Sequence, residues 1–230
     1  MSRILVVAAF LGSVAFAADL PVVASHLATG PGSHVQLTNT GSQTANAWSL
    51  AVTTPAGGNG THQVVETVDA YLSEMTRGVV GMPEQLNALL PGQTREIALD
   101  PLPADATVRV LAVVLEDDTA AGDIDMIRAI FERRVMERDE LQRVIGTFAE
   151  VLASGRGIPA LQELKRRFDV SAPEESTPHR AAREAVGSYL QRVTAGNAEQ
   201  IDQLLRQYVA LVERQHELAV RHSRWVTAPR

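Results

Sequence analysis

The spacing of hydrophobic residues along the chain changes near position 120. Before this point, apolar residues recur at every second position in short runs separated by Gly, Pro, Asn and Asp, which is typical of β-strands. After it, apolar residues recur every three or four positions, which is typical of amphipathic helices. The sequence therefore predicts an α+β chain, with strands first and helices afterwards.

Five strands are predicted in the first half. Trp48, Leu50 and Val52 alternate toward one face of the third strand, so we expect Trp48 to anchor a core. The second and third strands flank residues 39–42, where Asn and Gly tolerate the positive φ of a tight turn, and this predicts a hairpin. The predicted strands are 20–24, 34–40, 45–54, 94–100 and 107–115.

Residues 108–115 differ from the other predicted strands because both alternating faces are apolar, apart from Arg109. A strand with one solvated face would alternate, so we expect both faces to be covered, the second by the helices that follow. Between 61 and 90 the pattern fits helical and extended templates equally and predicts neither.

Four helices are predicted in the second half. The first begins at Asp123, whose carboxylate can cap the exposed N–H groups, and it ends at Gly155-Arg156-Gly157. In the last helix, an apolar stripe predicts bundle-like packing; its members are Ile201, Leu204, Tyr208, Leu211, Leu218 and His222. We expect this α-helical region to pack on the strands. The predicted helices are 123–153, 159–168, 180–194 and 198–224.

The stretch HVQLTNTGSQTANAWSLAVTTP, followed downstream by LLPGQTREIAL, resembles the small immunoglobulin-like domains of exported bacterial proteins. An N-x-G turn, a hydrophobic third strand and a PG-x-T strand entry carry the resemblance. The stretch VRVLAVVLEDDTAAGDIDMIRAIFERR is also similar to uncharacterised exported bacterial proteins, with Asp118 and Ala121 where those have Gly and Glu. The resemblance covers less than half of the chain, brings no catalytic residues, and implies an immunoglobulin-like β-sandwich at 18–117 ahead of the helical region at 118–230.

Residues 1–17 have the pattern of a signal peptide. Arg3 precedes an apolar run from Ile4 to Leu11, and small residues at 15–17 form an A-x-A-like cleavage site. This run is shorter than the roughly twenty residues that cross a bilayer, and no other stretch is apolar enough to do so. We expect cleavage after Ala17, no membrane span afterwards and a periplasmic or secreted location.

Composition narrows the classes of function. The chain has 0 Cys, which excludes disulfides, thiolate nucleophiles and cysteine-ligated metals. A net charge of -6 and only 4% aromatic residues disfavour a nucleic-acid partner. No Ser-His-Asp order or glycine elbow indicates a hydrolase, so we expect no catalytic residues and no cofactor.

The acidic turn at 116–125 is the candidate metal site. Carboxylates clustered on a loop suit a hard cation such as calcium. Their spacing does not match an EF-hand, and turn formation with helix capping explains the same residues. The candidate ligands are Asp117, Asp118, Asp123 and Asp125.

The sequence favours an exported non-enzymatic envelope protein whose sandwich and bundle provide a binding or scaffolding surface for a protein partner. The alternative is a carbohydrate- or peptide-binding module associated with an envelope enzyme system, which requires the ring of Trp48 or Tyr71 to face solvent. The C-terminal helices also predict a homodimer if the stripe of the last helix is not satisfied within one chain.

Overall fold

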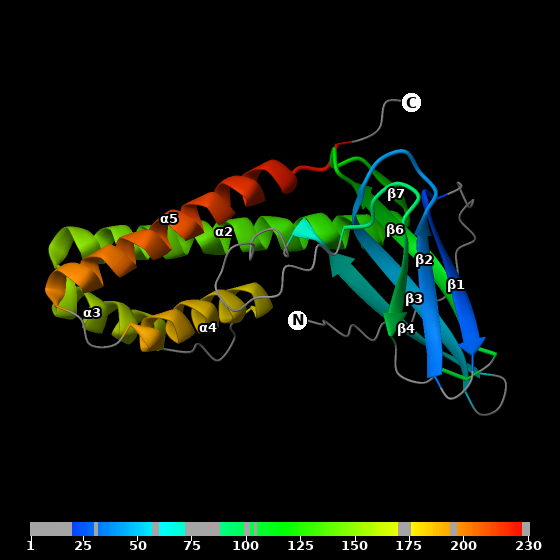
Figure 1. The fold of residues 1–230 in the computed structure, drawn as a ribbon, viewed down its shortest axis with the longest axis horizontal. Coiled ribbons are helices and arrows are strands. Elements are labelled where there is room, and N and C mark those ends of the chain that lie inside the picture. The colour runs from blue at the N-terminus through cyan, green and yellow to red at the C-terminus, as the bar shows by residue number, and fades with distance from the viewer. Residues whose placement is uncertain are drawn as a thin grey trace. The chain divides into compact units, whose positions relative to one another are not determined.

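The protein is an α+β chain in the computed structural model shown in Figure 1, with strands in the first half and four described helices in the second. Contacts divide it into two compact units, and the boundary falls inside a helix. The strand unit comprises Met1–Ile130 with Trp225–Arg230, and the helical unit comprises Phe131–Arg224. The structure describes residues 20–29, 32–56, 60–71, 88–98, 102–103, 105–169, 176–193 and 197–226.

The described strands of the strand unit form two antiparallel sheets. A three-stranded sheet has the order β1-β2-β5, and a four-stranded sheet has the order β4-β3-β6-β7. Two of the strands were not predicted: β4, in the region where the pattern was ambiguous, and the short β7. The strands are β1 (Val22–Thr29), β2 (Gly32–Asn39), β3 (Ala45–Ala56), β4 (Gly60–Asp69), β5 (Thr94–Ala98), β6 (Thr107–Leu115) and β7 (Ala120–Gly122).

The predicted hairpin between the second and third strands is wrong, because β2 and β3 belong to different sheets. Val35 and Leu37 of β2 meet Trp48 of β3 in one buried cluster, so the two strands face each other across a core. Alternating strands that share a core have the same sequence pattern whether they pair or oppose one another. The prediction that Trp48 anchors the core is confirmed, since its side chain is 1% exposed.

The chain turns between the two sheets around the buried side chain of Asn39. Its Nδ2 donates to the carbonyls of Gln43 and Leu89, both at 2.8 Å, and its Oδ1 accepts from the N–H of Gly41 at 2.9 Å. The φ of Gly41 is not positive, in contrast to the expectation for this turn. A Cβ at Gly41 would instead lie 2.8 Å from Cβ of Pro21, so close approach explains the glycine.

From Val110 onward β6 is buried on both of its faces, as its pattern predicted, whereas Thr107 and Arg109 at its start are exposed. Val110 and Val113 belong to the shared core, whereas Ala112 and Val114 are fully buried outside that cluster. The inward-facing residues change parity along β6 because its register with β3 shifts between Ser49 and Leu50. A bulge of this kind adds one residue and turns the following side chains to the opposite face.

The four helices lie close to their predicted positions. The side chain of Asn197 forms a capping box with Gln200 at the start of the last helix. Within the described residues, no helix is both long and apolar enough to cross a membrane. The helices are α2 (Ile124–Ser154), α3 (Gly157–Asp169), α4 (Thr177–Arg192) and α5 (Ala198–His222).

The apolar stripe predicted for α5 is displaced in the structure. Ile201 is buried as expected, but Leu204 is 39% exposed while Leu205 is fully buried. The buried positions repeat every seven residues, which is typical of helices packed nearly parallel or antiparallel to one another. They continue from Leu205 to Val212 and Ala219.

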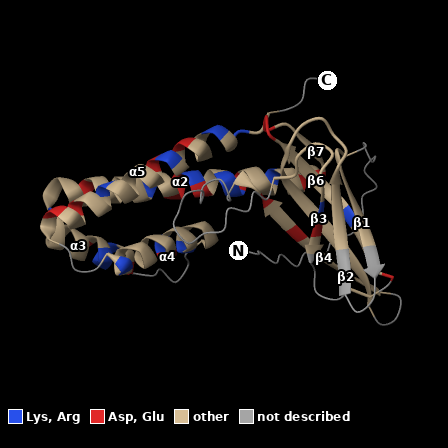
Figure 2. Ribbon diagram, viewed as in Figure 1, with Lys and Arg blue, Asp and Glu red and all other residues tan. Residues whose placement is uncertain are grey.

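α2 and α5 run side by side in opposite directions within the helical unit (Figure 1). One end of this pair belongs to an apolar core that includes Phe148 and Leu164. Charged residues of both signs follow the helices, whereas the strands are largely uncharged (Figure 2). The helices therefore combine an apolar interior with a charged outer surface.

Candidate functional site

Asp117 and Asp118, the first two aspartates of the acidic turn, form hydrogen bonds that stabilise the turn. Oδ1 of Asp117 accepts hydrogen bonds from the N–H and hydroxyl of Thr119, at 3.0 and 2.6 Å, and these bonds lower the pKa of Asp117 below its usual value. Asp118 is buried and has a φ of 61°, and its carbonyl accepts from the N–H of Val226. Asp118 therefore lies where Val226 contacts the turn.

The other two aspartates belong to the start of α2. Oδ1 of Asp123 accepts from the N–H groups of Asp125 and Met126, which makes it the helix cap, as predicted. Asp125 forms an ion pair with Arg128 at 2.8 Å. The described residues contain no group of three or more acidic or histidine side chains placed to hold a metal ion.

The two aromatic candidates are both interior. Trp48 and Tyr71 are each 1% exposed. A carbohydrate- or peptide-binding face built on either ring requires that ring to reach solvent. The structure does not meet this condition at either residue.

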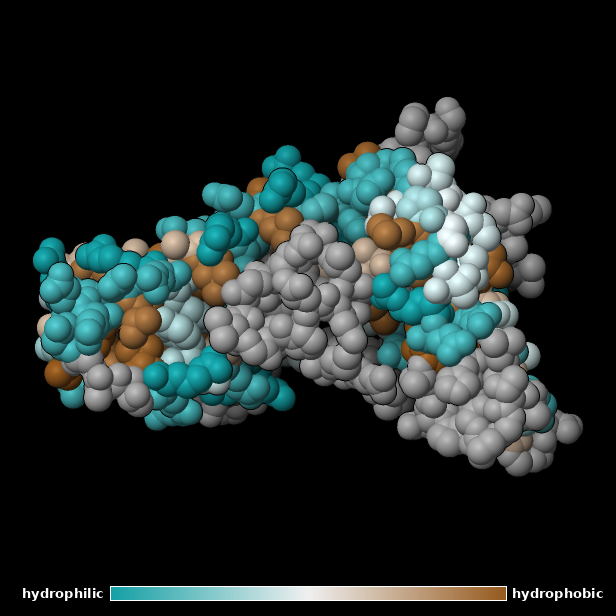
Figure 3. Space-filling model, viewed as in Figure 1, coloured by the Kyte–Doolittle hydropathy of each residue, from teal (hydrophilic) through white to brown (hydrophobic). Residues whose placement is uncertain are grey.

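A shallow, open depression of about 400 Å³ lies between α2 and α5. Its floor is formed by Leu152 and Val209, which are half-buried and pack against the core of the helical unit. Three exposed alanines also line the depression, and their short side chains leave the space between the helices open: Ala149, Ala153 and Ala210. In the view of Figure 3, the surface of the helical unit is mostly hydrophilic and its apolar side chains gather in small patches.

Two opposite charges border the depression on the α5 side. Arg206 and Glu213 are both exposed and lie seven residues apart, about 10 Å along the helix axis. Within the described part of the chain, neither forms a hydrogen bond or an ion pair through its side chain. Both charges are therefore available to a partner.

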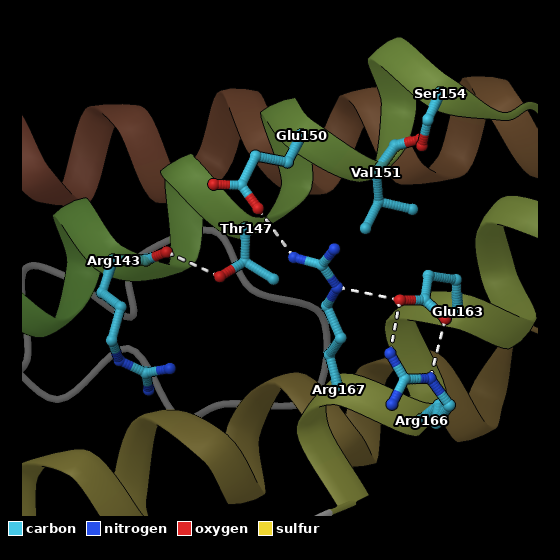
Figure 4. A network of polar contacts seen from close by, with 8 residues as sticks. All are labelled: Arg143, Thr147, Glu150, Val151, Ser154, Glu163, Arg166 and Arg167. Atoms are coloured by element: carbon cyan, nitrogen blue, oxygen red, sulfur yellow. Dashed lines mark hydrogen bonds and ion pairs between the residues drawn. The ribbon is translucent and has the colours of Figure 1, made fainter.

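Unlike Arg206 and Glu213, the charged side chains on the side of α2 that faces α3 are already paired (Figure 4). Arg167 of α3 contacts Glu150 of α2 at 2.7 Å and also Glu163, which Arg166 contacts as well. Hydrogen bonds from Arg166 and Arg167 lower the pKa of Glu163 to about 2. This network links α3 to α2 through the pair Arg167–Glu150, and each of its charged side chains has a partner of opposite charge.

A buried charge lies at the other end of the α2–α5 pair. Arg134 is fully buried, and its Nη1 donates to the carbonyl of His222 at 3.0 Å. Its guanidinium also lies 5.2 Å from the ring centroid of Phe131. The last carbonyls of a helix lack intrahelical donors and carry negative partial charge, so Arg134 caps the end of α5.

Sequence reasoning missed the depression and the buried arginine for different reasons. Arg134 lies three residues after Phe131, at a position of the apolar stripe of α2, but a charged residue type gives no local signal that its side chain is buried. The α5 side of the depression can be recognised in the sequence as a second face of this helix, formed by residues about one turn apart: Arg206, Val209, Ala210 and Glu213. The predicted apolar stripe of α5 lies one residue before the observed one, so the pattern did not separate this second face from the buried face.

Comparison with family models, curated proteins and solved structures gives no match. The site is therefore interpreted from its own geometry.

Proposed function

We propose that this chain is an exported, non-enzymatic protein of the cell envelope that binds or scaffolds a protein partner through its helical unit. The depression between α2 and α5 carries the proposal. It combines a half-buried apolar floor with the two exposed charges of Arg206 and Glu213. An apolar centre with a charged rim is the usual composition of a protein-binding surface.

Export is proposed from residues 1–17, which lie outside the described residues. Their basic start, apolar run and small residues before position 18 support cleavage after Ala17 and a periplasmic or secreted location. The test is to express the full chain with a C-terminal tag in a bacterium, fractionate the cells and measure the intact mass. A mature chain that begins at Ala18 outside the cytoplasm is expected, whereas a cytoplasmic chain that retains Met1 would contradict export.

For the strand unit, we propose an immunoglobulin-like sandwich. The two sheet orders support it, because they correspond to an A-B-E sheet opposite a C′-C-F-G sheet. The position of Trp48 on the third strand, buried between the sheets, also supports it. Nuclear Overhauser contacts between the Trp48 ring and Val35 test the facing arrangement, and their absence in a folded sample would contradict it.

Binding is tested with a photocrosslinking residue introduced at Ala153 in the depression. Irradiation of intact cells is expected to give a discrete protein adduct, identified by mass spectrometry and weakened by Arg206→Glu. The matched control places the same photocrosslinker at Ser188, an exposed residue of α4 outside the depression. Equal adducts from both positions, or none from Ala153, would contradict a binding role for this surface.

A further inference from the structure

We infer that the protein chain that occupies the α2–α5 depression is a second copy of this chain, bound about a two-fold axis that passes beside Val209 and Ala210. This inference rests on the proposed binding function of the same surface. It names the partner, which the proposed function leaves open.

The charges of the depression are complementary to those of a second copy. Two identical helices that cross in opposite directions about an axis between Val209 and Ala210 bring position 206 of one chain beside position 213 of the other. Arg206 then meets Glu213 of the second copy, and by symmetry the reverse pair forms as well. Each chain therefore contributes the same surface, and the two surfaces together form one symmetric interface.

Arg206 and Glu213 differ from other charged residues of the helical unit. Described arginines on the faces between helices already have partners, such as Arg167 with Glu150 and Arg143 with Glu140. Arg206 and Glu213 border an apolar hollow and have no ion-pair partner within the described part of the chain. A second copy satisfies both at once.

The small side chains of the depression leave room for a second helix. A helix packs closely against another when small side chains lie at the crossing point. Ala210 lies beside the proposed axis, and Ala149 and Ala153 widen the hollow next to it. Leu152 and Val209 then supply the apolar surface that the second helix covers, which is the arrangement of an antiparallel helix pair.

The experiment measures the mass of the purified protein by light scattering and sedimentation equilibrium over a range of micromolar concentrations. A dimer is expected. Arg206→Glu places like charges opposite each other twice and should raise the dimer dissociation constant by roughly tenfold or more. Arg180→Glu makes the same change of charge at an exposed residue of α4 outside the depression and should leave the constant unchanged.

The decisive variant is the double charge swap, Arg206→Glu with Glu213→Arg. It rebuilds both pairs with reversed polarity, so dimerisation should return to near its original strength. A dimer that is insensitive to the single change, or a swap that fails to restore it while the helical circular dichroism is unchanged, overturns this interface.

The lack of cysteine allows a direct check of the axis. Ala210→Cys should form one disulfide-linked dimer under mild oxidation, because the two copies of this position lie beside the axis. Ser188→Cys is the matched control and should form no disulfide-linked dimer under the same oxidation.

A protein that remains monomeric at every concentration overturns the second-copy inference. If the photocrosslinker at Ala153 then still captures a different envelope protein in an Arg206-dependent way, the proposed binding function stands. If it captures nothing, the proposed function fails as well.

Discussion

The strand unit and the helical unit each bury a polar side chain beside an apolar core, but the two side chains differ in chemistry. Asn39 in the strand unit is a neutral amide with three hydrogen bonds to backbone groups, two within its own turn and one to Leu89, fifty residues away. Arg134 in the helical unit is a cation that caps a helix end distant in sequence. A neutral amide can specify a local turn at low electrostatic cost, whereas a buried cation is tolerated only where tertiary structure supplies acceptors.

The largest expected effects come from the apolar cores, and they test whether the two units are separate. Leu37→Ala should lower the free energy of unfolding of the strand unit by about 2–5 kcal/mol, because Leu37 is fully buried there. Both tryptophans belong to the strand unit, so their fluorescence in urea reports its unfolding. Phe148→Ala should instead shift the helical circular dichroism transition by about 3–5 kcal/mol. Equal shifts in both signals for both variants would show one cooperative body.

The next effect concerns the buried cation. Arg134→Ala should destabilise the helical unit by roughly 3 kcal/mol, because it leaves the carbonyl of His222 without this donor and removes packing against Phe131. Urea unfolding followed by helical circular dichroism measures the change. Arg128→Ala, at an exposed residue of the same helix, is the control and should cost far less. If the two variants behave alike, Arg134 does not stabilise the end of α5.

The buried amide should have a somewhat smaller effect. Asn39→Ala leaves the carbonyls of Gln43 and Leu89 without this donor and should lower the stability of the strand unit by about 2 kcal/mol. Tryptophan fluorescence in urea measures it. Ser42→Ala, at an exposed residue in the same turn, should stay within roughly 0.5 kcal/mol. Loss of the helical signal at the same urea concentration would argue against a local role for Asn39.

The smallest effect is a dependence on alkaline pH that is confined to the helical unit. Burial raises the pKa of Tyr208 to about 12 from an ordinary value of 10.0, so between these values the unfolded chain loses its proton while the folded chain keeps it. Stability is therefore fully present below pH 10 and falls as the pH rises toward 12. Tyr208→Phe should reduce this fall by about 1 kcal/mol at pH 11, measured as the difference between variant and parent in urea. An identical fall in both proteins would contradict the assignment to Tyr208.

Local sequence patterns predicted most elements but not their pairing. The alternation around Trp48 predicted a buried strand, yet it could not tell a hairpin from two strands that oppose each other across a core. The same limit applies to Asn39, whose place before a glycine predicted a turn, while its bond to Leu89 depends on a segment fifty residues away. The parity change in β6 depends on the bulge with β3, which no local pattern records.

In the candidate site, the capping role of Asp123 could be predicted because a cap depends only on its own helix. The depression could not, because it exists only where α2 and α5 meet with Ala153 on one side and Ala210 on the other.

The sequence by itself determined the change from strands to helices near position 120 and the approximate ends of the helices, since each depends on contacts within a few residues. Only the tertiary structure decided which strands share a sheet, that Arg134 is buried, and that Arg206 and Glu213 border one hollow. Those outcomes depend on neighbours far apart in the chain, and the spacing of residues along one segment does not encode which neighbours it meets.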